Sequence, residues 1–234
     1  MNKRYGNLTI IIPTLNEQGN IGRVIGRLDE MYPGVRIIVA DDGSMDNTEK
    51  EVRAASKRID VTFFDRRKMR VHGLTASVVD ASLLARTDYI VVMDGDMQHP
   101  PELVGSMYRK LSEYDIVIGV RMEVKNWGLH RIILSKGMAI ISYTVFRARG
   151  KPVTRDMMSG FFGIRAGIIK ELARRRRKGF VMHGYKVLLD ILRMADPGVS
   201  ICEVEYSTFH RRLYGRSKLK IRRMIEVLES TFRG

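Results

Sequence analysis

Residues 89–100 read YIVVMDGDMQHP, an apolar run that ends in two aspartates one residue apart. Two other short apolar runs have the same form. Residues 8–12 lead into Pro13-Thr14-Leu15-Asn16-Glu17, and residues 35–40 lead into Asp41-Asp42-Gly43-Ser44. Short β-branched runs bounded by turn residues are typical of buried parallel strands. The segment 89–100 therefore predicts a buried strand whose carboxyl end carries polar side chains.

The rest of the chain alternates between strand-like and helix-like stretches. This alternation predicts an α/β fold with a mainly parallel, Rossmann-like sheet flanked by helices. Further strands are expected at 61–64, 115–119, 161–164 and 199–206, and helices at 21–31, 46–58, 74–85, 129–147, 166–174, 183–194 and 217–232.

The three acidic clusters are expected to meet, because ligands in such sheets bind at the carboxyl ends of the strands. Asp94 and Asp96 can reach one cation, and hard oxygen ligands suit magnesium or manganese. Gln98 can add a neutral oxygen, and Gly95 lets the backbone approach a ligand closely. A plain surface turn also favours Asp and Gly, but three clusters in this order favour a metal site.

Composition limits the partners. The formal net charge is +15, which indicates nucleic acid, anionic lipid or a phosphorylated substrate nearby. Cys202 is the only cysteine, so an internal disulfide is excluded and a reducing, cytosolic-side location is expected. No apolar stretch reaches the roughly 18 residues that span a bilayer, and the N-terminus lacks a signal-peptide core. We expect a soluble or peripheral protein.

Together, residues 13–17, 41–44 and 94–100 resemble the signature of family 2 glycosyltransferases with the GT-A fold. The last motif is especially similar to that of the polyprenol-phosphate (dolichol-phosphate) mannose synthases, which usually have Ala and Leu where Gly95 and Met97 stand here. The resemblance implies one catalytic domain over 1–234. In it, residues 1–120 would bind a nucleotide-sugar, and residues 121–234, with the C-terminal amphipathic helix, would bind the acceptor.

The resemblance also implies roles for single residues on the donor side. Asp94, Asp96 and Gln98 would hold Mn2+ or Mg2+ on the donor diphosphate, with Asp96 counted among the catalytic residues. Asp42 would lie near the base or the ribose. His72 stands where the family usually has lysine, which leaves a charge contact to the donor in doubt. The nucleotide-sugar site would comprise Pro13, Leu15, Glu17, Asp42, Asp94, Gly95, Arg212, Arg216 and Lys218.

On the acceptor side, Arg121, Arg131 and Ser135 match positions that bind the acceptor phosphate in the polyprenol-phosphate enzymes. Arginine suits such bidentate phosphate contacts, although solvated surface arginines are common in a basic protein. Asp156, in a segment similar to Asp-x-x-Ser-Gly-Phe, would face the reaction centre or else cap a turn. The loop 211–219 resembles Tyr-Gly-x-Ser-Lys-Leu, so Arg212, Arg216 and Lys218 could close over the diphosphate.

We therefore expect inverting, metal-dependent transfer of a hexose, mannose from GDP-mannose first, to a polyprenol or dolichol phosphate. The protein would act at the cytoplasmic face of a membrane, held peripherally by its basic surface or by a membrane-anchoring subunit. A UDP-sugar donor such as UDP-glucose, with the same lipid or a saccharide as acceptor, stays an alternative. So does a non-catalytic basic module that binds membrane or nucleic acid, although the acidic clusters argue against a nucleic-acid partner.

Overall fold

The computed structural model describes residues 4–56, 59–122, 129–207 and 231–232, and for 129–136, 138 and 139 it describes the backbone alone. Its centre is a seven-stranded sheet with the order β3-β2-β1-β4-β6-β5-β7. The strands are β1 (Leu8–Thr14), β2 (Arg36–Asp41), β3 (Val61–Asp65), β4 (Tyr89–Val92), β5 (Ile116–Arg121), β6 (Phe162–Arg165) and β7 (Ile201–Tyr206).

The sheet is mainly parallel, as the sequence predicts. Strands β3, β2, β1 and β4 run parallel to one another, and β7 runs parallel to β5. The exception is β6, which pairs antiparallel with both β4 and β5. Strands β1, β2 and β4 are mostly apolar and mostly buried, and burial on both faces of the sheet explains this pattern.

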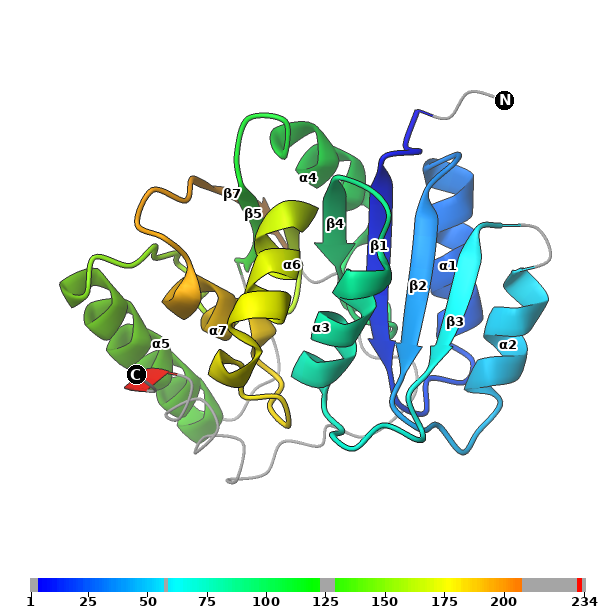
Figure 1. Ribbon diagram of the computed structural model, residues 1–234, viewed down its shortest axis with the longest axis horizontal. Helices are drawn as coiled ribbons and strands as arrows, with labels where there is room; N and C mark the ends of the chain where they lie inside the picture. The colour runs from blue at the N-terminus through cyan, green and yellow to red at the C-terminus, as the bar shows by residue number, and fades with distance from the viewer. Residues whose placement is uncertain (1–3, 57–58, 123–128, 208–230, 233–234) are drawn as a thin grey trace.

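Helices cover both faces of the sheet (Figure 1). One apolar core lies under α3, α6 and α7, and a second lies under α1, α2 and α4. The α-helices are α1 (Ile21–Met31), α2 (Thr48–Ala55), α3 (Leu74–Leu84), α4 (Val104–Lys110), α5 (Leu129–Ala148), α6 (Ala166–Arg175) and α7 (Val187–Met194).

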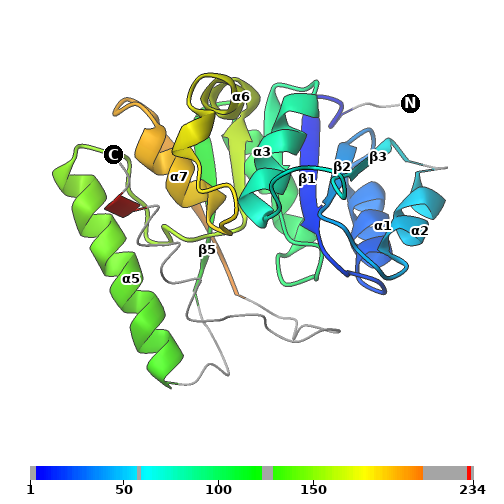
Figure 2. The same ribbon diagram turned by 60° about the horizontal axis from the view of Figure 1, so that its bottom comes forward.

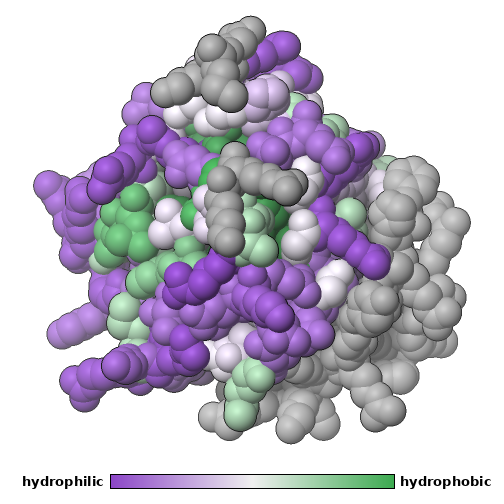
Figure 3. Space-filling model, turned by 90° about the vertical axis from the view of Figure 1, so that its right-hand side faces the viewer, coloured by the Kyte–Doolittle hydropathy of each residue, from purple (hydrophilic) through white to green (hydrophobic). Residues whose placement is uncertain are grey.

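Helix α5 stands beyond α7 at one end of the molecule in both ribbon views (Figures 1 and 2). The described end of the chain lies against it, because the hydroxyls of Ser142 and Thr231 are 2.8 Å apart. The opposite end, which carries α2 and β3, is mostly hydrophilic (Figure 3). Within the described residues, no helix combines the length and the hydropathy that crossing a membrane requires.

Three details differ from the sequence prediction, and in one of them helix α7, expected from residue 183, begins only at Val187. Helix α4, which follows a 3-10 turn at Pro101–Leu103, was not predicted. Its signal was present, since Val104, Met107 and Leu111 are spaced for one buried face. Helix α2 begins at Thr48 rather than at residue 46. The carboxylate of Asp46 lies before it and accepts the Thr48 N–H at 3.0 Å.

The order of the strands creates a topological switch point. The chain passes from β1 to β2 and β3 on one side, and then crosses back to β4 on the other side of β1. The loops that follow β1 and β4 therefore diverge at their carboxyl ends. Open α/β sheets bind ligands at such a point, and here it lies between the loop that begins at Leu15 and the acidic segment that begins at Asp94.

Candidate active site

The acidic segment 94–100 turns sharply after β4. Asp96 is buried, with 2% of its surface exposed, whereas the Asp94 side chain is 37% exposed. The Gln98 N–H donates to Oδ1 of Asp96 at 3.1 Å. Met97 has a φ of 63°, a left-handed conformation that is uncommon for a residue other than glycine. The backbone thus turns back directly after Asp96 and keeps both aspartates in one short turn.

His99 fixes the start of this turn, a role that the sequence analysis did not assign. Its ring is buried and stacks on Phe161 with the ring centroids 5.1 Å apart. Nδ1 accepts the Asp94 N–H at 2.9 Å, so the ring proton resides on Nε2, 3.7 Å from Oδ2 of Asp94. Burial lowers the pKa of His99 to about 4, although the charge of Asp96 acts to raise it. His99 is therefore neutral at pH 7.

The aspartates fit a cation that is shared with a ligand. Among the described residues, no three His, Cys, Asp or Glu side chains converge into a site that could hold a metal by themselves. Magnesium commonly takes one or two carboxylates and completes its shell with phosphate oxygens and water. Asp94 and Asp96 supply that number of carboxylates within one turn. The residues present therefore suit a cation bound together with a diphosphate.

The loops after β1 and β2 are fastened to each other. The buried carboxylate of Asp41 accepts the Thr14 hydroxyl at 3.0 Å and the backbone N–H groups of Gly43 and Ser44. The Ser44 hydroxyl in turn accepts the Asn16 N–H at 2.8 Å. Asp41 thus organises the loops, and Asp42 is left as the aspartate of this pair that faces the neighbouring loop.

Other residues predicted for the donor site lie close by, Pro13 near the end of β1, Leu15 and Glu17 on the loop after it, and Gly95 in the turn after β4. Pro13 and Glu17 are half-buried, and Leu15 is exposed. Glu17 accepts the side-chain N–H of Asn20 at 3.0 Å and donates its backbone N–H to Thr48. The packing around Gly95 is close, because a Cβ there would lie 3.3 Å from Ile12. This glycine therefore matches the narrow space beside β1.

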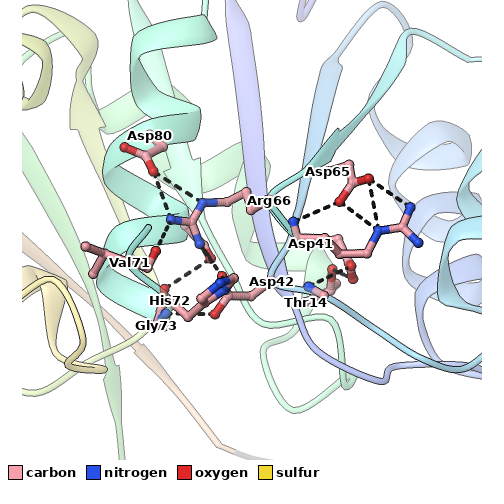
Figure 4. A network of polar contacts seen from close by, with 12 residues as sticks. Thr14, Asp41, Asp42, Asp65, Arg66, Val71, His72, Gly73 and Asp80 are labelled. Atoms are coloured by element: carbon pink, nitrogen blue, oxygen red, sulfur yellow. Dashed lines mark hydrogen bonds and ion pairs between the residues drawn. The ribbon is translucent and has the colours of Figure 1, made fainter. Parts of the chain in front are cut away.

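Asp42 joins a network of polar contacts that also escaped the sequence analysis (Figure 4). Its Oδ1 pairs with the buried guanidinium of Arg66 and lies 3.0 Å from Nδ1 of His72. Its Oδ2 accepts the Gly73 N–H at 2.7 Å. His72 thus contacts the carboxylate of Asp42 from the segment that leads into α3.

The segment 156–160 lies beside the acidic turn. Ser159 donates its hydroxyl to Gly119 O at 2.7 Å, and the Met158 N–H donates to Oδ1 of Asp156 at 3.2 Å. A Cβ on Gly160 would lie 3.4 Å from the His99 ring and 3.8 Å from the oxygens of Asp94. The predicted acceptor-side segment therefore packs directly on the acidic turn.

Two cations lie near this contact. Arg121 ends β5, and its buried Nε has no hydrogen-bond partner within the described part of the chain. Lys186, which the sequence analysis missed, donates to Met158 O at 2.6 Å. Arg121, Lys186 and Asp156 all influence the pKa of His99, the two cations lowering it and Asp156 raising it. The charges of both cations and of Asp156 thus act on the same buried ring.

Other predicted residues cannot be placed in the site. Arg131 and Ser135 belong to α5, where the structure describes only their backbone. Arg212, Arg216 and Lys218 lie outside the described residues. Their roles stay predictions.

Several known proteins are similar in sequence to this chain. The family model described as Glycosyl transferase family 2 matches residues 9–173. A dolichol-phosphate mannosyltransferase of Pyrococcus furiosus is 31% identical over 97% of this chain, and the chain spans 63% of that protein's length. A dolichol-phosphate mannosyltransferase of Saccharomyces cerevisiae is also 31% identical, over 94% of this chain and 84% of its own.

A solved structure shows the same fold. Glucosyl-3-phosphoglycerate synthase from Mycobacterium tuberculosis, in complex with Mn2+, uridine-diphosphate and phosphoglyceric acid, is similar with a TM-score of 0.70 and 18% identity. The match covers 96% of this chain and 76% of that chain. The sheet described above is therefore a GT-A fold.

Proposed function

We propose that this chain, which belongs to glycosyltransferase family 2, transfers mannose from GDP-mannose to a polyprenol or dolichol phosphate. The observation that carries the proposal is the contact between the Asp94–Asp96 turn and the segment 156–160. In this contact Gly160 packs on His99 and Asp94, Lys186 donates to Met158 O, and the charges of Arg121 and Lys186 both act on the His99 ring. The names of the two mannosyltransferase relatives support mannose and a lipid phosphate as substrates.

In this proposal residues 1–120 bind the donor. Pro13, Leu15, Glu17 and Asp42 line the nucleotide pocket. Asp94 and Asp96, with Gln98, would hold Mn2+ or Mg2+, which when bound would supply positive charge to the departing nucleotide diphosphate. His99 keeps the backbone of Asp94 in place for this contact.

Residues 121–234 bind the acceptor, with Arg121, Arg131 and Ser135 on its phosphate. An oxygen of that phosphate attacks the anomeric carbon on the face opposite the diphosphate. The carbon–oxygen bond to the diphosphate breaks, and GDP leaves with the bonding electrons. The acceptor phosphate is already anionic, so no general base is required. Asp156 orients the sugar or the arginines, and Arg212, Arg216 and Lys218 close over the diphosphate.

The acceptor also sets the place of action. A polyprenol chain lies in a bilayer, so the enzyme would work peripherally at the cytoplasmic face of a membrane. A net charge of +15 favours an anionic lipid surface. A membrane-anchoring subunit could supply the same attachment.

A panel of nucleotide-sugars tests the proposal. GDP-mannose, UDP-glucose and other nucleotide-sugars are each incubated with a phosphopolyprenol and Mn2+, and the glycolipid product is quantified, with EDTA as the control. We expect product from GDP-mannose and none after chelation. Product from UDP-glucose alone would replace the donor assignment. Calorimetry with GDP and with UDP, each with and without Mn2+, completes the test, since failure of both nucleotides to bind would refute the transferase.

A further inference from the structure

Arg66 follows β3 directly and has only 1% of its surface exposed. A guanidinium has five N–H donors, and a buried donor that lacks an acceptor is costly. Here the donors meet five acceptor contacts. Nε and Nη2 donate to Oδ2 of Asp80, Nη2 also donates to Val71 O, and Nη1 donates to Ser77 and Asp42. Figure 4 shows the guanidinium between Asp80 on one side and Asp42 on the other.

The anchoring side of this network is rigid. Ser77 and Asp80 lie one turn apart on α3, a helix that is buried along most of its length. Asp80 is also paired with Arg177, which lies in the 3-10 turn Arg177–Gly179 after α6. Two arginines and two aspartates thus balance in charge. Arg66 is thereby fixed from α3, so its other edge can hold Asp42 in one position.

Most acceptor sites of the Asp42 carboxylate already take part in hydrogen bonds. A carboxylate only accepts, so Nδ1 of His72 must carry the proton in their contact. Oδ1 then accepts from Arg66 and His72, and Oδ2 accepts from Gly73. A carboxylate offers about four acceptor sites. Within the described part of the chain three of them are filled, and the one that stays open is on Oδ2.

We infer that Arg66 is a positioning residue of the nucleotide pocket, which holds Asp42 so that one acceptor site on Oδ2 stays open to the nucleoside. This inference rests on the proposed function, because it takes Asp42 to contact the base or the ribose. Arg66 itself touches no nucleotide. Its effect is on nucleotide affinity, transmitted through the orientation of a single carboxylate.

A lysine at position 66 cannot make the same set of hydrogen bonds. Its ammonium keeps the positive charge but has three donors at one point, whereas the planar guanidinium reaches Asp80, Val71 O, Ser77 and Asp42 at once. Arg66→Lys therefore keeps the charge and removes the fixed direction of Asp42. Asp80→Asn is a second variant, one step further from the nucleotide, which weakens the anchor of Arg66.

The experiment measures GDP and UDP affinity by calorimetry in the presence of Mn2+, together with KM and kcat for the donor. Arg193→Lys is the matched control for Arg66→Lys, because Arg193 is also a buried arginine, bonded to Gly179 O and paired with Asp190. Asp115→Asn is the control for Asp80→Asn. Asp115 is half-buried, bonded to Ser200 and Arg165, and precedes β5 at the opposite end of the sheet.

We expect Arg66→Lys to raise the Kd of the preferred nucleotide about tenfold or more, the loss typical of a misplaced hydrogen bond to a charged group. KM for the donor should rise in parallel, with kcat at saturation within about threefold of wild type. Asp80→Asn should weaken binding in the same direction, and it decides the matter if Arg66→Lys does not fold. Both control variants should bind nucleotide as wild type does.

Unchanged affinity in Arg66→Lys and Asp80→Asn, beside normal nucleotide binding by the wild type, would overturn this inference and leave the proposed function standing. Equal losses in the Arg193→Lys control would also overturn it, because the effect would then follow from general destabilisation. A wild-type protein that binds no nucleotide would overturn the inference and the proposed function together.

Discussion

Replacing His99 separates two contributions to the acidic turn. His99→Phe keeps a ring stacked on Phe161 but removes Nδ1, the acceptor of the Asp94 N–H. Leaving that donor without a partner costs about 1–2 kcal/mol, the lower part of the usual range because the bond is only partly buried. His99→Asn does the reverse, since its amide oxygen can stand near the Nδ1 position while the ring contact, worth about 0.5–1.5 kcal/mol, is lost.

The two variants should differ more in binding than in stability. We expect urea unfolding, followed by circular dichroism, to show losses of similar size for His99→Phe and His99→Asn. The Mn2+-dependent part of nucleotide affinity should fall about tenfold in His99→Phe alone, because only this variant frees the backbone of Asp94. The reasoning is refuted if His99→Phe binds Mn2+ and nucleotide as wild type does, or if His99→Asn loses as much affinity.

Three other expectations follow from the same region. The pKa of His99 lies near 4 in the folded protein, against an ordinary value of 6.5. The unfolded chain therefore binds the extra proton first as the pH falls from 6.5 to 4. The free energy of unfolding should therefore fall by about 3 kcal/mol as the pH drops from 6.5 to 4, because of His99 alone. Urea unfolding at pH 7.5 and at pH 4.5 should show that this His99-dependent fall is missing in His99→Phe. Asp96→Asn keeps the volume of a buried side chain but removes its charge, so transfer should fall at least about 100-fold with an unchanged circular dichroism spectrum; near-normal turnover would refute the metal role. Lys186→Met removes the bond to Met158 O, so kcat should fall while GDP affinity, measured by calorimetry, stays within about twofold; an equal loss of affinity would place Lys186 on the donor side instead.

Much of the fold is already present in local sequence patterns. Strands β1, β2 and β4 are apolar runs that end in turn residues, and both features are readable without knowing any partner. Helix α4 was missed although Val104, Met107 and Leu111 have helical spacing. Its beginning is fixed at long range, by the Tyr32 hydroxyl that donates to Pro101 O at 2.7 Å.

In the candidate site, too, some residues can be predicted from sequence motifs and others cannot. Asp42, Asp94 and Asp96 stand in motifs at strand ends, so the sequence predicts their grouping through the rule that parallel strands share one carboxyl edge. Arg66 has no such motif. Its five acceptor contacts come from three stretches of the chain, the loop after β2, the segment at Val71 and helix α3, and only the packing of α3 on the sheet beside β2 shows that they form one network.

By itself the sequence determined the mainly parallel α/β sheet, the order of its acidic turns and the family to which they belong. These depend on periodicity and on residue types within a few positions of each other. Only the tertiary structure decided which side chains hold those turns: His99 beneath Asp94, Arg66 behind Asp42, and Lys186 under the segment 156–160. The physical reason is that burying a polar group requires a partner, and that partner comes from whichever element packs beside it in space.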